Sequence, residues 1–507
     1  MSNYSKHNYD LTNSANDQTA NLTASQAAAR SIAKKTDSPF THFEVLFCIY
    51  ALLFYTEVWW TFVSHLGPVI LLIRYSILGI SMILLSFRAK TLIKILPKGK
   101  WLWLYGAVCI LSMAWTINAG ETLIGILQVF VQVSVFGLYF TSRFNPKHQL
   151  YILACALAIT ISINLFYVIA LPSIGIHSDD KFAGAWKGIY ANKNAFSGTM
   201  LWSMAVFYIL SFKDTNKLAT RLARIGLFIS PILVILSTSK TALVLSFALI
   251  VVLMLWSRYS WQGRRTVLIL DLGLLSTLVI VGGVISEWVA IVTGLGKDPT
   301  LSGRTVIWAG AIAQIHRKPL LGYGYTAFWT PDNPAARSIG DALYPGFYTF
   351  HSHNGFIDVI LNVGWVGFAI FTIGFISTWT LALKYAYKAS SPGDTWPLAV
   401  MILVTLYNTT ESTLITDNMD WLFYVLAFLS VRIWPQQKVL ATAKIQASAT
   451  TELAHRTANI PTSSHIPTSN IQTSNIPTSN IPTSDTPAAE TSTTADALPN
   501  TAADSSC

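Results

Sequence analysis

Long apolar runs recur along most of this 507-residue chain, and they limit the possible folds more than any other feature. Most are about 18 to 25 residues long, the length at which a helix crosses roughly 30 Å of hydrocarbon. Only 11% of the residues are charged, whereas soluble domains carry about a quarter. The sequence therefore predicts an all-α polytopic membrane protein.

If each run forms one helix, the chain has about twelve transmembrane spans. The predicted spans are residues 43–63, 66–87, 101–118, 121–141, 149–171, 194–212, 223–238, 240–257, 266–293, 354–383, 396–412 and 417–434.

The connections between these spans differ in charge, and this difference predicts their orientation. With the N-terminus inside, every even-numbered connection should be cytoplasmic and rich in Lys and Arg. The cations in those connections are Arg88, Lys90, Lys94, Lys98, Lys100, Arg143, Lys147, Lys213, Lys217, Arg221, Arg224, Arg258, Arg264, Arg265, Lys384 and Lys388. The last outside turn, residues 411–420, has none. We therefore expect both termini in the cytoplasm, and the net charge of +10 does not indicate nucleic-acid binding.

The two ends of the chain differ from the middle. Residues 1–40 and 435–507 are polar, and the tail repeats a unit close to IPTSN. Frequent Pro and few large apolar side chains are typical of disorder. We expect disordered cytoplasmic ends around a membrane domain at 41–434. No cleavable signal is evident, and Cys48, Cys109 and Cys155 lie in apolar runs as packing residues.

Two predicted outside loops, 172–193 and 294–352, keep cations. The second is too long to be structureless, and its apolar spacing from Thr305 to Ile315 predicts an amphipathic surface helix with Ser302 as N-cap. Arg304 would lie in the first turn of this helix. There the free backbone N–H groups and the helix dipole add to its charge, so the position favours an anion.

Two further outside turns carry cations beside polar side chains. Lys240 stands in STSKTAL next to hydroxyl groups, and Lys187 and Lys193 stand in WKGIYANKN. Ammonium and hydroxyl groups bind phosphate oxygens. Together with Arg304, these turns predict a phosphate-binding region on the outer side of the membrane.

His351 and His353 precede the span predicted at 354–383. A zinc or copper site needs three or four ligands, and the nearest other candidates are His316, Asp332 and Asp341. We therefore predict no metal site. A neutral His near the surface is suited to take a proton from a hydroxyl group. A structural His at the start of the helix remains the alternative.

The stretch from Arg304 to Gly367 resembles the shared core of the O-antigen ligase and polysaccharide polymerase superfamily of bacterial membrane glycosyltransferases. Ligases of that family carry His, then Asn, Ser or Gln, nine residues, Gly, two residues, and then Gly, Thr or Tyr. Here His353, Asn354, Gly364 and Gly367 have that spacing. The segments SGRTVIW and PLLGYGYTAFW are also similar to the superfamily.

The resemblance implies a GT-C-like fold and a metal-independent, inverting glycosyl transfer without a cofactor. The donor would be a glycan on undecaprenyl diphosphate, and the acceptor a sugar hydroxyl on lipid A-core or on a second lipid-linked glycan. The protein would lie among the lipids of the inner membrane, with its site facing the periplasm. His353 would be the catalytic base, and Arg304, Lys240 and Lys193 would bind the diphosphate. Supporting positions would be His351, Asn354, Arg74 and Tyr323.

Some features leave the choice of activity open. The family usually has Arg where this chain has Lys240, and Lys cannot bind phosphate bidentately. The Lys-Asn pair at 193–194 is more similar to exopolysaccharide polymerases. A transporter is a third possibility. It would need ionisable groups near the bilayer midplane, for which Glu57 and Arg74 are a candidate pair.

The predicted orientation can be tested with single cysteines. A cysteine at Ser338 should react with a membrane-impermeant thiol reagent in intact cells whose outer membrane has been permeabilised. A cysteine at Thr215 should not react, because the cation distribution places it in the cytoplasm. The opposite labelling pattern would overturn the whole topology.

Overall fold

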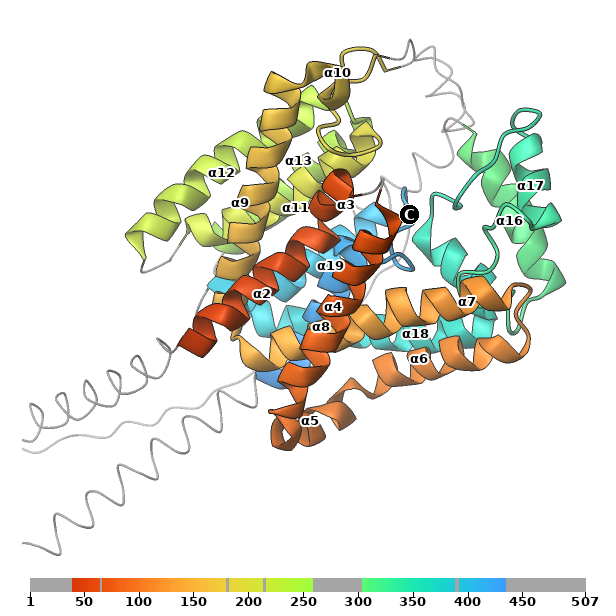
Figure 1. The fold of residues 1–507 in the computed structure, drawn as a ribbon, viewed down its shortest axis with the longest axis horizontal. Coiled ribbons are helices and arrows are strands. Elements are labelled where there is room, and N and C mark those ends of the chain that lie inside the picture. Colours follow the sequence, from red (N-terminus) through yellow and green to blue (C-terminus); the bar gives the residue numbers. More distant parts are fainter. Residues whose placement is uncertain are drawn as a thin grey trace, which may run out of the picture. The chain divides into compact units, whose positions relative to one another are not determined.

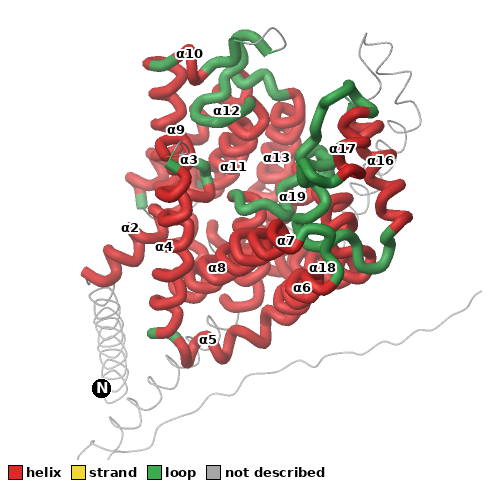
Figure 2. Tube along the Cα trace, turned by 45° about the vertical axis from the view of Figure 1, so that its right-hand side comes forward, coloured by secondary structure: helices red, strands yellow, loops and turns green. Residues whose placement is uncertain are grey.

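A computed structural model describes residues 39–63, 66–178, 182–212, 216–258, 303–387 and 392–434, all of which fall within one compact unit, Met1–Lys444. This part of the chain is helical and contains no strand (Figures 1 and 2). The helices are α2 (Pro39–Tyr55), α3 (Val58–Val63), α4 (Gly67–Ser86), α5 (Ala89–Ile95), α6 (Lys100–Leu111), α7 (Ala119–Gly125), α8 (Gln132–Arg143), α9 (Pro146–Ala170), α10 (Pro172–Gly175), α11 (Lys193–Ser211), α12 (Lys217–Leu236), α13 (Lys240–Arg258), α16 (Arg304–Arg317), α17 (Pro334–Asp341), α18 (Gly355–Tyr387) and α19 (Trp396–Tyr407), followed by a helix over 419–434.

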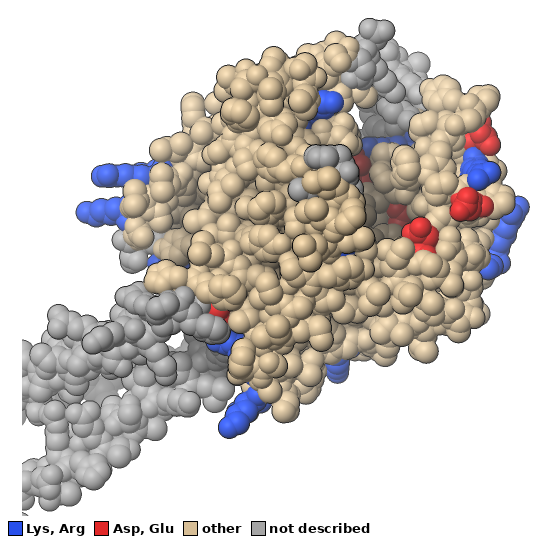
Figure 3. All heavy atoms as spheres, viewed as in Figure 1, with Lys and Arg blue, Asp and Glu red and all other residues tan. Residues whose placement is uncertain are grey.

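Five of the described helical stretches are long and apolar enough to cross a membrane. They are Gly67–Ser86, Ala119–Arg143, Pro146–Ala170, Lys217–Leu236 and Gly355–Tyr387. Most of the described surface in the view of Figure 3 is uncharged, as expected for helices that face lipid. The protein is therefore an all-α polytopic membrane protein, as predicted.

Several predictions fall outside the described residues. These are the span at 266–293, the N-cap at Ser302, Thr215 and the two disordered ends. The count of twelve spans thus stays a prediction. The surface helix is present as α16, with Gly303 at its N-cap position.

The first predicted span, 43–63, is not one continuous helix. It is broken at Thr56 and Glu57, between α2 and α3. Glu57 has a φ of 62°, in the left-handed region that a side chain rarely adopts. The predicted span 396–412 also ends early, because α19 stops at Tyr407. Polar backbone and carboxylates are thereby placed at the ends of helices instead of within them.

Two helices are surrounded by protein. Residues Phe196 to Ser211 of α11 are all buried, and the helix over 419–434 is nearly so. Helices that are apolar on every side are expected at the centre of a bundle. The indole Nε1 of Trp202 in α11 donates a hydrogen bond to Asp420 Oδ1 at 2.8 Å, which joins the two helices.

The cation-rich connections contact one another. Arg88 Nη1 donates to the carbonyl oxygen of Ser142 at 3.3 Å, and Arg143 forms an ion pair with Glu44 at 2.7 Å. Gly393 lies directly against the backbone of Lys147. These three connections therefore lie at one end of the helices, as the predicted topology requires.

Helix α18 contains a kink at Gly364, which has φ 64° and ψ −174°. The segment before α17 packs into this kink. Tyr323 N donates to Leu361 O at 2.9 Å, and Trp365 N donates to Pro319 O at 2.8 Å. A Cβ at position 364 would lie 2.2 Å from Leu320 O. Only glycine fits both the backbone angle and this close approach.

Besides the main apolar core of the helix bundle, a second apolar cluster joins α16, α17 and α18. It includes Ile307 and Ile315 of α16, Ile339 of α17, and Leu361 of α18. Figure 2 shows α16 and α17 side by side, connected to the other helices by loops. The first turns of α18 therefore pack in one cluster with α16 and α17 as well as against the membrane helices.

The kink generates a stability prediction. Gly364→Ala should destabilise the protein by about 1–3 kcal/mol, because the new Cβ strains the backbone and collides with Leu320. Thermal unfolding in detergent would measure the loss. Gly79→Ala in α4 is the matched control, since a Cβ there meets no atom within 4 Å. Equal melting temperatures for the two variants would contradict this role of the kink.

Candidate active site

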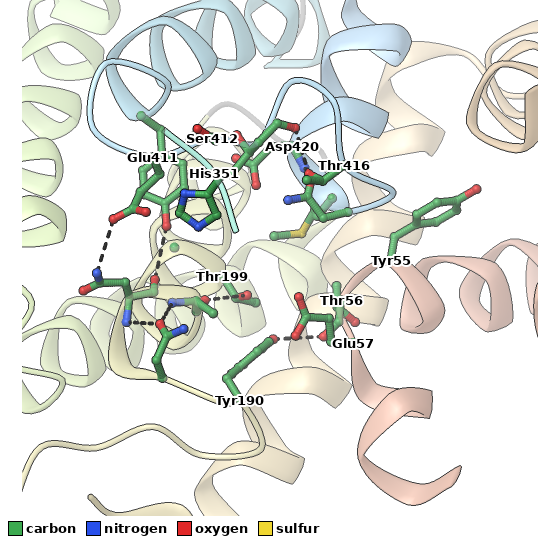
Figure 4. Close-up of a pocket in the computed structure, with 18 of the residues that line it drawn as sticks. Tyr55, Thr56, Glu57, Tyr190, Thr199, His351, Glu411, Ser412, Thr416 and Asp420 are labelled. Carbon is green, nitrogen blue, oxygen red and sulfur yellow. Dashed lines mark hydrogen bonds between the residues drawn. The ribbon is translucent and has the colours of Figure 1, made fainter. Parts of the chain in front are cut away.

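A cavity of about 280 Å³ lies where four separate segments meet. Its walls come from the α2–α3 break, from residues 190–199, from the two histidines that precede α18, and from residues 407–420. Figure 4 shows His351 and Glu411 on one side of this cavity and Glu57 and Tyr190 on another. The lining groups are mostly hydroxyls, amides, imidazoles and carboxylates.

The carboxylate of Glu411 contacts two of the other three segments and also Arg304 of α16. Its Oε1 lies 3.1 Å from Arg304 Nη2 and accepts a hydrogen bond from Asn194 Nδ2 at 3.2 Å. Its Oε2 lies 3.2 Å from His353 Nδ1. Glu411 is only 8% exposed. A buried carboxylate needs such partners because burial alone would favour its neutral form.

The electrostatics follow from these contacts. Burial acts to raise the pKa of Glu411, but the hydrogen bond with His353 and the charge of Arg304 outweigh it and lower that pKa. Glu411 is therefore ionised at neutral pH. Burial and the neighbouring His353 lower the pKa of His351 to about 4, so His351 is neutral.

The backbone at His353 is unusual. Its φ is 56°, in the left-handed region, and its N–H donates to His351 Nδ1 at 3.2 Å. Asn354 caps α18, since its Oδ1 accepts from the N–H groups of Phe356 and Ile357 at 3.1 and 3.2 Å. Strained residues persist only where the surroundings hold them, and they concentrate at functional sites.

A second buried carboxylate holds the segment before α18. Asp358 Oδ1 accepts from Trp329 Nε1 at 2.7 Å, and Asp358 Oδ2 accepts from Ser352 N at 3.2 Å. Trp308 of α16 donates to the carbonyl oxygen of Ser352 at 2.9 Å. Ser352 is completely buried between the two histidines. The imidazoles are thereby anchored to α16 and to the start of α18.

The structure brings the predicted cation-bearing turns together. Lys193 Nζ donates to Thr238 Oγ1 at 3.2 Å and lies 4.4 Å from the centroid of the Phe182 ring. Ser239 Oγ donates to Asn194 Oδ1 at 3.1 Å, and Asn194 in turn contacts Glu411. Lys240, the first residue of α13, is exposed beside these residues.

Two predicted supporting residues lie elsewhere. Arg74 forms an ion pair with Asp417 at 2.5 Å, and not with Glu57. Tyr323 donates to Gln314 Oε1 at 3.0 Å and belongs to the second apolar cluster. Neither residue lines the cavity.

Sequence reasoning missed the carboxylates Glu411 and Asp358 as site residues, and it considered Glu57 only in a candidate transport pair with Arg74. Residues 411–420 were noted only because they lack cations. The available signal was that this turn carries several carboxylates on the same predicted side as Arg304 and His353. Which carboxylate pairs with which cation depends on tertiary packing.

One group of three described residues has the geometry to hold a metal ion. Candidate ligand atoms of His351, His353 and Glu411 all lie within 4.8 Å of one another. Arg304 opposes a cation here, because its guanidinium already occupies Glu411 Oε1. The candidates suggested by sequence are elsewhere: Asp332 pairs with Arg337 at 3.7 Å.

Parts of the chain are similar to known proteins. Residues 225–372 match the O-antigen ligase family, a range that contains Lys240, Arg304 and His353 but ends before Glu411. The chain is also 34% identical over 95 residues to the exopolysaccharide production protein ExoQ of Rhizobium meliloti (strain 1021). That match covers 18% of this chain and 22% of the relative. Part of this chain is therefore similar to O-antigen ligases and to an exopolysaccharide production protein.

Proposed function

We propose that this protein is a metal-independent, inverting membrane glycosyltransferase. It transfers a glycan from undecaprenyl diphosphate to a sugar hydroxyl in surface polysaccharide synthesis. The observation that supports this most directly is the shared contact of Glu411 with His353 and Arg304 at the wall of a polar cavity. One carboxylate thus holds a candidate base beside a candidate phosphate ligand.

His353 is the base in this proposal. An ionised carboxylate only accepts hydrogen bonds, so His353 carries its proton on Nδ1, facing Glu411. The lone pair is then on Nε2, which takes the proton of the acceptor hydroxyl. Glu411 fixes the ring orientation and stabilises the imidazolium that forms, as a carboxylate does in a catalytic triad.

The bond changes balance without a further reactant. The acceptor oxygen forms a bond to the anomeric carbon as its proton moves to His353. The bond from the anomeric carbon to the phosphate oxygen breaks, and its electron pair leaves with undecaprenyl diphosphate. Arg304 has five N–H donors in total, so the guanidinium can hold Glu411 and still donate to phosphate. Lys240 and Lys193 add positive charge.

The proposed location is the bacterial inner membrane, with the cavity facing the periplasm and both termini in the cytoplasm. The distribution of Lys and Arg supports this orientation. Arg88 contacts Ser142 at one end of the helices, and Asn194 contacts Glu411 at the other end. Both contacts are consistent with this orientation.

The acceptor has two candidates. Lipid A-core is the first, which the match to the O-antigen ligase family supports. A second lipid-linked repeat is the other, which would make the protein a polymerase. The name of the relative ExoQ and the Lys193–Asn194 pair favour this second candidate.

One reconstitution distinguishes these activities. Purified protein would receive undecaprenyl diphosphate-linked repeats, with or without lipid A-core. Product on lipid A-core identifies a ligase, and longer lipid-linked chains identify a polymerase. Transfer to neither would refute the proposed glycosyl transfer and favour transport.

The role of His353 gives a specific expectation. His353→Ala should lower turnover by about 10²–10⁴-fold, the usual contribution of a general base, while the protein still inserts and binds lipid-linked donor. His351→Ala should be much milder, and chelators should not change the rate. Equal losses in both variants, or inhibition by chelators, would instead identify the pair as metal ligands.

Arg304 is tested with a control on the same helix. Arg304→Ala should lower donor use by about 10–100-fold, the value of one or more charge-assisted hydrogen bonds. Arg304→Lys should recover only part of it. Arg317→Ala, at the exposed end of α16, should change little. Lys240→Arg should be tolerated, because the family usually has Arg there. Full donor use by Arg304→Ala would remove Arg304 from the site.

A further inference from the structure

The interior of the cavity is lined by carboxyl groups. Its lining includes the carboxylates of Glu57, Glu411 and Asp420, but no Lys or Arg among the residues that the structure describes. The candidate phosphate ligands approach from outside this lining: Arg304 reaches Glu411 from α16, and Lys193 reaches Thr238. A diphosphate is therefore attracted to the cations at the edge of the cavity and meets no Lys or Arg among the described residues that line its interior.

The three carboxylates are not equally available to a ligand. Glu411 is occupied by Arg304, Asn194 and His353. Asp420 accepts a hydrogen bond from Trp202 at 2.8 Å. The carboxylate of Glu57 has no hydrogen-bond or ion-pair partner within the described ranges, and it faces the cavity from the α2–α3 break (Figure 4).

The wall around Glu57 is well anchored. Tyr190 OH donates to the carbonyl oxygen of Thr56 at 3.0 Å, and Thr56 Oγ1 lies 3.1 Å from Thr160 Oγ1 of α9. The backbone N–H of Glu57 donates to Phe54 O at 3.0 Å. These contacts hold the backbone of the break that carries Glu57.

The size and lining of the cavity indicate one sugar ring. Its volume of about 280 Å³ is at the low end of ligand pockets, which hold roughly 300–1,000 Å³. Carboxylates accept hydrogen bonds from hydroxyl or ammonium groups, and amides such as Asn194 add donors and acceptors. A further carboxylate brought in by a ligand would have no cation to pair with in the interior.

We propose that this interior is the acceptor subsite, in which Glu57 binds hydroxyl or ammonium groups of the acceptor monosaccharide. The subsite admits neutral or amino sugars and rejects acidic sugars such as uronates. The proposal rests on the proposed function, since it assigns one part of the substrate to the cavity next to His353. It makes Glu57 a specificity-determining residue.

The first test measures binding without turnover. Full-length protein in detergent would be titrated with methyl β-glucoside and methyl β-glucuronide, and followed by saturation-transfer NMR. The glucoside should bind about tenfold or more tightly than the glucuronide, the value of one charge-assisted hydrogen bond. Glu57→Gln should remove most of this preference, because it keeps the size of the side chain and loses the charge.

Two variants serve as controls. Glu57→Asp should retain the preference, because the negative charge remains. Glu121→Gln, an exposed glutamate in the first turn of α7 and outside the cavity lining, should bind both glycosides as the unmodified protein does. Equal binding of both glycosides, binding of neither, or an unchanged preference in Glu57→Gln would overturn the proposal.

A transfer assay separates this proposal from the proposed function. Lipid-linked acceptors would differ only in their terminal residue, glucose or glucuronic acid. Preference for the glucose acceptor that falls in Glu57→Gln supports both proposals. Transfer with no preference overturns the subsite and leaves the glycosyltransferase. A Glu57-dependent preference in binding, with no transfer at all, supports the sugar selectivity of the cavity and overturns the glycosyltransferase.

Discussion

The site depends on one buried carboxylate that is shared by separate parts of the chain. Glu411 contacts Arg304, Asn194 and His353, which lie far from it in sequence. Removing one partner of a buried charge costs more than forming the pair contributes, because the remaining charge stays desolvated. The segments that carry Arg304, Asn194 and His353 are therefore energetically dependent on each other. An enzyme of the proposed kind needs this dependence, because its base and its phosphate ligands come from different segments.

Irregular backbone supports this arrangement. Four described residues other than glycine have positive φ, and three of them, Glu57, His353 and Thr238, are at the cavity or contact Lys193. Each lies next to the end of a helix, where the chain can depart from regular geometry without leaving buried N–H groups unpaired. The strain is balanced by the surrounding contacts, such as those of Asp358 with Ser352 and Trp329.

Much of the fold could be predicted because membrane helices depend on local composition. The apolar runs predicted α4, α9 and α18 closely, and helical spacing predicted α16. The break at Glu57 was not predictable, since no Pro or Gly marks it. Arg304 and His353 were identified from chemistry and motif, and the structure places them on one carboxylate. Glu411 itself was missed, because a lone acidic residue after an apolar run has many possible partners.

The kink at Gly364 divides α18 into two parts with different attachments. The turns before it share backbone hydrogen bonds with the segment around Tyr323 and are capped by Asn354, directly after His353. The turns after it pack against α6 and α19. His353 thus precedes the part of α18 that packs against the segment around Tyr323, and the longer part after the kink packs among the membrane helices. Substitutions in the segments that pack before the kink can therefore change the position of the histidine while the helix after the kink keeps its packing against α6 and α19.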